Sequence, residues 1–197
     1  CNPVDTGCYI FDGNGDFFFL NDSITSSICV DDTIAYYNFV KKIVERYDGD
    51  NIDDMPGLTL PLLVWEFGNE SESFCGNYFP DDYVRDLNIT RRAINDACTN
   101  CQLTNGGALE ITDMVTDTAF WTKVITQGYP DIDFGNIHFN IGKYSYSYPY
   151  ATFKENVDRF QNLLTAVGKS KETWVTEWGI YSGSPNNQPY ISEEEQS

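Results

Sequence analysis

The stretch VWEFGNE at residues 64–70 decides the fold expected of this chain, and WVTEWG at residues 174–179 repeats its design. Each stretch is a short apolar run that leads to a glutamate. A strand that ends in a carboxylate delivers it to the mouth of a parallel barrel, and two such strands can place two carboxylates across a cleft. We therefore expect Glu70 and Glu177 to face each other.

Strand and helix signals alternate along the rest of the chain. Apolar residues at helical spacing predict helices at about residues 32–47, 81–97, 116–126 and 152–167, and short apolar runs predict strands at about 64–70, 102–104, 134–140 and 173–177. Asp32 or Thr33 is suited to cap the first helix, and Gly168 is suited to end the last. This alternation predicts an α/β fold with a parallel sheet and helices outside it.

The composition limits both the size of the fold and its partners. At 197 residues the chain can bury one sizeable core, but it is shorter than the roughly 250 residues usual for an eight-stranded α/β barrel. Its formal net charge is -18, from 30 acidic and 12 basic residues, so a nucleic acid or a polyanionic substrate would be repelled. No run of about 18 apolar residues is present, so no membrane span is expected.

Cysteines and sequons indicate the compartment. Six cysteines, an even number, fit an oxidising environment better than a cytosol that keeps thiols reduced. Of the glycosylation sequons at Asn21, Asn69 and Asn88, the first and last lie in polar surroundings and agree with a secreted, extracellular glycoprotein, whereas Asn69 is expected to face the cleft and stay unmodified. Residues 1–31 are rich in Asp, Asn, Gly and Ser and carry Cys1, Cys8 and Cys29, so we interpret them as a loop excursion pinned by disulfides.

Cys98 and Cys101 are interpreted as a disulfide rather than as half of a zinc site, because no second pair has suitable spacing.

Residues 192–195, SEEE, form the capping box of a helix, yet only two residues follow them. Four strands would also leave two sheet edges unpaired, which folded proteins normally avoid. We therefore expect residues 1–197 to form a single partial barrel domain, with about strands four to seven of eight, that a missing segment or a second chain completes.

Residues 65–70 (WEFGNE), the strand that holds His138, and residues 176–179 (TEWG) together resemble strands four, six and seven of a clan A glycoside hydrolase. These enzymes are cellulase-like (β/α)8 barrels of the TIM type, and the similarity extends across most of residues 32–197. The resemblance implies that the chain is the central portion of such a barrel and is a glycosidase that needs no cofactor.

The resemblance and the chemistry of glycosidic cleavage together give roles to the two glutamates. A leaving sugar oxygen must be protonated as its bond breaks, and we expect Glu70 to be that acid. The resemblance implies that Glu177 is the nucleophile of a double displacement, which predicts retention of configuration and carboxyl groups roughly 5–5.5 Å apart. Asn69 is expected to hydrogen-bond the sugar's 2-hydroxyl. The predicted substrate is a β-linked, largely neutral poly- or oligosaccharide.

Two neighbouring residues leave alternatives open. Glu66 shares a strand face with Glu70 by the period of two, one layer deeper, where it would need a buried partner. His138 is expected to orient sugar hydroxyls or to steady Glu177, although a lone histidine is often structural. The clan usually has an aromatic residue two positions after this histidine, where this sequence has Asn140.

Aromatic side chains are the candidates for stacking on sugar faces. Trp178 follows the nucleophile, and Tyr144 begins a tyrosine-rich loop at the expected active-site face. Either ring could instead fill a gap between loops. Tyr144 or Tyr146 could also hydrogen-bond the nucleophile in place of the missing aromatic residue.

No metal is predicted in the site. The acidic loop from Asp48 to Asp54 is either solvated or holds a structural calcium ion, since hard cations prefer several carboxylates close together.

Two functional classes remain. One is a secreted retaining glycosidase with a carbohydrate substrate, and the other is a non-catalytic carbohydrate-binding or extracellular structural protein derived from a glycosidase barrel. The glutamate pair favours the enzyme.

Overall fold

The computed structural model describes residues 9–11, 17–19, 30, 32–72, 78–108, 115–141, 149–168 and 172–180. Four parallel strands carry the core of this structure: β3 (Val64–Phe67), β4 (Gln102–Asn105), β5 (Gly135–Ile141) and β6 (Thr173–Ile180). β3 pairs with β4, and β5 pairs with β6. Parallel bridges from Thr104 to Phe134 and from Ala108 to Ile137 join the two pairs. The strands therefore lie side by side in chain order.

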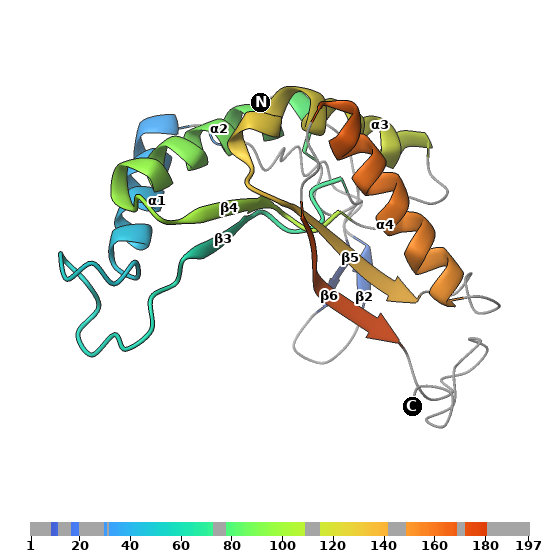
Figure 1. Cartoon of the computed structure of the whole chain (residues 1–197). Helices are drawn as coiled ribbons and strands as arrows, with labels where there is room; N and C mark the ends of the chain where they lie inside the picture. The colour runs from blue at the N-terminus through green and yellow to red at the C-terminus, as the bar shows by residue number, and fades with distance from the viewer. Residues whose placement is uncertain are drawn as a thin grey trace.

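Four helices connect and cover these strands: α1 (Thr33–Glu45), α2 (Pro80–Ala97), α3 (Val115–Gly128) and α4 (Pro149–Ala166). A short 3-10 helix, η1 (Tyr129–Asp131), follows α3. Figure 1 shows the helices along one side of the curved strands, as the alternation predicts. The α/β class with parallel strands is confirmed, whereas closure into a barrel stays a prediction.

Local signals explain where these helices begin and end. The side chain of Asp32 accepts hydrogen bonds from the N–H groups of Ile34 and Ala35, so it caps α1. Pro80 occupies the first turn of α2, where its missing N–H has no cost. Gly168 follows α4 with φ of +88°, a left-handed conformation that favours glycine.

Tyr83 is the centre of the core between α2 and the strands. Its side chain is fully buried, and its ring contacts those of Phe67, Phe120 and Trp121 with centroids 4.9–5.7 Å away. Its hydroxyl donates to the carbonyl of Phe67 and accepts from the N–H of Gly106, at 3.0 Å each. Burial raises the pKa of this phenol. One side chain thus connects the ends of β3 and β4.

Several expectations need correction. Within residues 1–31, β1 (Tyr9–Phe11) and β2 (Phe17–Phe19) pair as two short antiparallel strands, so this segment also holds regular structure, in line with the preference of aromatic residues for strands. β3 ends at Phe67, before Glu70, and β6 continues to Ile180, past Glu177. Neither glutamate is therefore the last residue of its strand.

The disulfide between Cys98 and Cys101 is confirmed. Cys1, Cys8, Cys29, Asn21 and the capping box at residues 192–195 lie outside the described residues. Among the described helices, none is both long and apolar enough to cross a bilayer.

Candidate active site

A tight turn after β3 delivers Glu70 to the site. Gly68 has φ of +79° and Glu70 has φ of +43°, so two residues of this turn are left-handed. A side-chain carbon added at Gly68 would lie 2.7 Å from Ser71 Oγ, so this position excludes other residues. A left-handed glutamate is uncommon and costs free energy, and such strain is found mainly at functional sites. The turn aims the carboxylate of Glu70 toward β5.

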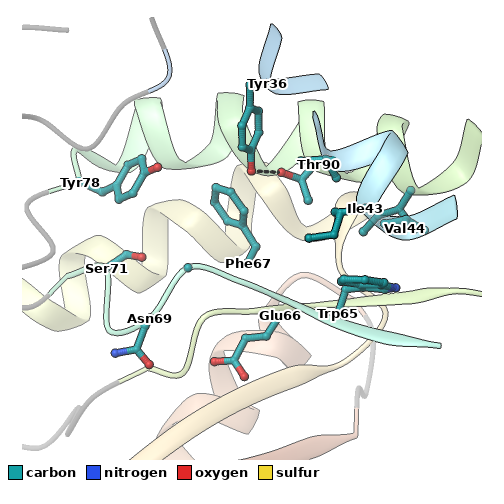
Figure 2. A pocket seen from close by; sticks show the side chains of 13 residues that line it. Tyr36, Ile43, Val44, Trp65, Glu66, Phe67, Asn69, Ser71, Tyr78 and Thr90 are labelled. Atoms are coloured by element: carbon teal, nitrogen blue, oxygen red, sulfur yellow. Dashed lines mark hydrogen bonds between the residues drawn. The ribbon is translucent and has the colours of Figure 1, made fainter. Parts of the chain in front are cut away.

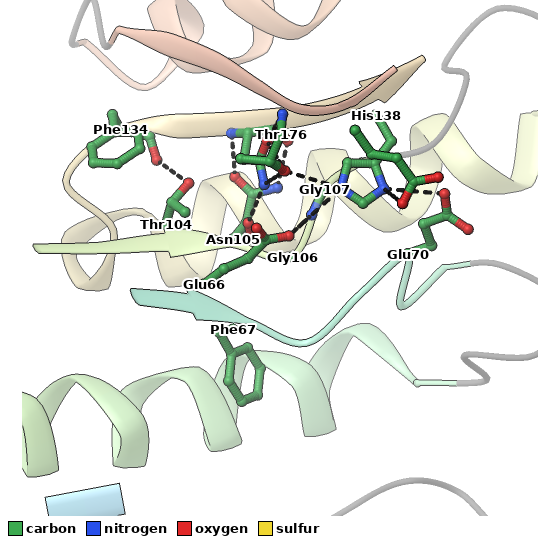
Figure 3. Close-up of polar contacts among 12 residues, drawn as sticks. Glu66, Phe67, Glu70, Thr104, Asn105, Gly106, Gly107, Phe134, His138 and Thr176 are labelled. Carbon is green, nitrogen blue, oxygen red and sulfur yellow. Dashed lines mark hydrogen bonds and ion pairs between the residues drawn. The ribbon is translucent and has the colours of Figure 1, made fainter. Parts of the chain in front are cut away.

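His138, in the middle of β5, receives this carboxylate. Its side chain is only 3% exposed, and its Nδ1 lies 3.1 Å from Glu70 Oε1 and 3.7 Å from Glu177 Oε2. One atom from each of these three side chains lies within 4.8 Å of the others. Figure 3 shows Glu70 reaching the histidine from the turn after β3. The sequence's two glutamates therefore do meet, at the Nδ1 edge of one buried imidazole.

Glu66 approaches the other edge of the same imidazole. Its Oε1 lies 3.6 Å from His138 Nε2 and accepts a 3.0 Å hydrogen bond from the N–H of Gly107. Figure 2 shows Glu66 and Phe67 on opposite faces of β3, the alternation that a strand imposes. Glu66 thus lies on the side of β3 that faces His138, as expected, but its side chain is 29% exposed rather than buried, and these contacts are its partners.

Glycine at position 107 makes room for the histidine. A side-chain carbon there would stand 2.0 Å from His138 Cδ2 and 2.1 Å from Nε2, far inside van der Waals contact. The ring therefore packs directly on the backbone that follows β4. This contact was missed by the sequence analysis, and the adjacent glycines Gly106 and Gly107 after a predicted strand were the available signal.

An irregularity in β6 brings two adjacent side chains to one face. The register steps from Ile137 opposite Val175 to His138 opposite Glu177, which leaves Thr176 as an extra residue. Such a bulge re-aims side chains, and here both Thr176 and Glu177 reach His138, from 3.1 Å and 3.7 Å. Strict alternation would have put them on opposite faces, so the role of Thr176 was not predicted.

Behind Thr176 lies a polar network that the sequence analysis also missed. Asn105 and Asn136 are fully buried, and their side chains bond to each other's backbone: Asn105 Nδ2 donates to Asn136 O at 2.8 Å, and Asn136 N donates to Asn105 Oδ1 at 2.8 Å. Asn136 Nδ2 donates to Thr176 Oγ1 at 2.8 Å. Asn136 thus has a structural role next to Thr176.

The other predicted site residues are less constrained. Asn69 is exposed in the turn after β3, beside a cavity of about 490 Å³ between α1, α2 and β3 that is mainly apolar. Trp178 is 51% exposed, and its ring packs against Phe139 and Phe153 at 5.3 Å and 4.9 Å, which leaves part of the indole accessible. Tyr144 and Tyr146 lie outside the described residues, as does the side chain of Asn140.

Among the described residues, two groups of side chains have ligand atoms close enough to share a cation. In the first, Glu70, His138 and Glu177, the 3.1 Å contact of Glu70 with the imidazole is already a hydrogen bond. In the second, Asp48, Asp50 and Asp54 mainly accept N–H groups of their own loop. Burial, the main cause, raises the pKa of Asp48. Calcium in this loop stays a prediction, as does the absence of a cofactor.

Comparison with known proteins adds a likeness of fold. No family model and no curated protein sequence matches the chain. A glucosidase from Croceicoccus marinus matches 81% of this chain with a TM-score of 0.62 and 15% identity. The α-L-arabinofuranosidase from Thermotoga maritima matches 77% of this chain with a TM-score of 0.55 and 16% identity. A family 51 α-L-arabinofuranosidase from Bifidobacterium longum matches 73% of this chain with a TM-score of 0.51 and 15% identity.

This chain spans only 33–34% of the length of those three enzymes. At such low identity the likeness establishes a shared fold over that third, and it leaves the chemistry to be argued from the site.

Proposed function

We propose that this chain carries the catalytic centre of a retaining glycoside hydrolase. The observation that carries the proposal is the meeting of Glu70 and Glu177 at one buried histidine, with an oxygen of each carboxylate within 4.8 Å of the other. This closeness is compatible with a double displacement, in which the carboxyl groups stand roughly 5–5.5 Å apart.

The surroundings of the two glutamates support different roles. Glu70 is 21% exposed and has a hydrogen bond to His138, as befits a group that must hold a proton in a fixed direction. Glu177 is 50% exposed, so its carboxylate can approach an anomeric carbon. In the proposed first step Glu177 attacks that carbon while Glu70 protonates the leaving oxygen, and in the second step Glu70 deprotonates the water that releases the sugar.

We propose a β-linked, neutral poly- or oligosaccharide as the substrate. The charge of -18 disfavours acidic sugars. Two of the structural neighbours described above are arabinofuranosidases that act on α-linked sugar by their names, so an α-L-arabinofuranoside belongs in any substrate panel. Secretion and glycosylation remain part of the proposal.

The test is hydrolysis of aryl glycosides, with the product anomer followed by NMR and the nucleophile trapped by a fluorinated, slowly turned over glycoside. We expect retention and a covalent sugar on Glu177, found by peptide mass spectrometry. Glu70→Gln should abolish hydrolysis of glycosides that have poor leaving groups. It should still allow covalent trapping of Glu177 by a glycoside that has an activated leaving group. Glu172→Gln, which removes the same charge just outside β6, is the matched control and should keep full activity.

The competing class is a non-catalytic carbohydrate-binding protein. It predicts that sugar binds with unchanged affinity to the wild type and to Glu177→Gln, and that no variant or substrate gives a covalent adduct. That pair of results would replace the enzymatic proposal.

A further inference from the structure

We propose that Thr176 fixes the tautomer of His138, and so decides which oxygen of Glu70 carries the catalytic proton. His138 lies at the centre of the site, with Glu70 and Glu177 near Nδ1 and with Thr176 and Glu66 near Nε2. A neutral imidazole carries one proton on one of these two nitrogens. The hydrogen bonds around Thr176 determine which one.

The orientation of the Asn136 amide is the first step. Its Oδ1 lies 3.3 Å from the N–H of Thr176, which can only donate, and its Nδ2 lies 3.3 Å from the carbonyl of Asn105, which can only accept. A flipped amide would place two donors together and two acceptors together. The nitrogen therefore faces Thr176 Oγ1 at 2.8 Å and donates to it.

The hydroxyl proton of Thr176 is the second step. Among the described residues, its acceptors within hydrogen-bond distance are Asn136 Oδ1 at 3.0 Å and His138 Nε2 at 3.1 Å. The amide already donates to this hydroxyl, and its oxygen and nitrogen are too close together for the hydroxyl to accept from one and donate to the other with good angles. The proton therefore points to His138, and Nε2 accepts it with its lone pair.

The position of the charges agrees with this assignment. Two carboxylates, from Glu70 and Glu177, lie 3.1 Å and 3.7 Å from Nδ1. Of the described carboxylates, Glu66 alone is paired with Nε2, at 3.6 Å, and it already accepts from Gly107. A proton on Nδ1 is therefore better stabilised than one on Nε2. His138 then donates from Nδ1–H to Glu70 Oε1.

The consequence for the reaction rests on the proposed function. Because Oε1 of Glu70 accepts the Nδ1–H, a proton on that same oxygen would be repelled. The acid proton is therefore held on Oε2, which remains available to the leaving oxygen. Thr176 is a positioning residue in this scheme: it acts on the acid through His138 and the buried asparagines.

The test uses the fact that the chain has a single histidine. Long-range proton–nitrogen NMR on nitrogen-15-labelled protein, made without a polyhistidine tag, reads its tautomer directly near neutral pH. We expect a protonated Nδ1 and a bare Nε2 in the wild type and in Thr176→Ser, which keeps the hydroxyl. In Thr176→Val, which keeps the shape but loses the hydroxyl, Nε2 should gain a proton.

A wild-type spectrum with a proton on Nε2, or a Thr176→Val spectrum identical to the wild type, would overturn the proposal. This reading needs no substrate, so a protein with the expected tautomer but no activity would refute only the proposed function. In an active protein, losing one such hydrogen bond should lower kcat about 3- to 10-fold in Thr176→Val, and Thr176→Ser should restore it.

Discussion

Replacing Gly107 by alanine tests whether the backbone after β4 really sets the position of His138. The added carbon would stand 2.0 Å from His138 Cδ2, whereas ordinary contacts begin at about 3.4 Å, so the ring must move by roughly 1.5 Å. That shift breaks its 3.1 Å hydrogen bonds to Glu70 and Thr176. Gly107 is not left-handed, so alanine brings no backbone strain to confuse the result.

The expected loss of stability follows from these contacts. Overpacking costs about 1–3 kcal/mol, and each lost hydrogen bond adds about 0.5–1.5 kcal/mol, so Gly107→Ala should lower the free energy of unfolding by about 2–6 kcal/mol. If the site is catalytic, kcat should also fall about 100-fold, because a misplacement of about 1 Å can have that effect.

A double-mutant cycle in urea unfolding isolates the contact. In the His138→Ala background the ring is gone, so the same Gly107→Ala change should cost less than about 1 kcal/mol. If alanine at position 107 costs the same in both backgrounds, within about 0.5 kcal/mol, then His138 is not what Gly107 accommodates and the reasoning is wrong.

Two further predictions concern stability. Tyr83→Phe removes the hydroxyl that bonds Phe67 O and Gly106 N, so it should cost about 2–4 kcal/mol in chemical unfolding, and a loss below about 0.5 kcal/mol would contradict the link between β3 and β4. Burial raises the pKa of Asp48 above its ordinary 3.8, so the folded chain binds this proton more tightly and stability falls as pH rises from 3.8 through the raised value. Asp48→Asn can still accept the hydrogen bond from the N–H of Asp50. This variant should be more stable than the wild type at neutral pH and should lose the pH dependence, which melting temperatures across a pH series would measure. Melting temperatures that change with pH in parallel for the two proteins would refute the prediction.

The helices were predictable because their signals are local. The Asp32 cap and the terminal Gly168 each act within one turn, and apolar residues at helical spacing identified the helices between them. The parallel order of the strands followed from the alternation of strands and helices. The proximity of Glu70, His138 and Glu177 also followed, since the same ends of neighbouring parallel strands share one edge of a sheet.

What the sequence could not predict depends on two irregularities of backbone. Period-two reasoning places Glu66 and Glu70 on one strand, but left-handed Gly68 and Glu70 end the strand early and turn the second carboxylate sideways. The bulge at Thr176 has no local sequence signal, because it arises from how β6 registers against β5. Without it, the hydroxyl and the carboxylate of Thr176 and Glu177 would lie on opposite faces.

These departures from ideal structure meet at one place. A left-handed glutamate, a bulged strand, a glycine that leaves room for a ring, and a buried histidine near three carboxylates each reduce stability or give up packing. None of them is needed to join α2 or α4 to the strands, since apolar side chains already do so. A protein selected only for stability would replace this cluster by apolar packing, which is often neutral or stabilising by about 1–4 kcal/mol. Its concentration at the ends of β3 and β4 and across β5 and β6 is therefore better explained by chemistry on a ligand than by support of the fold.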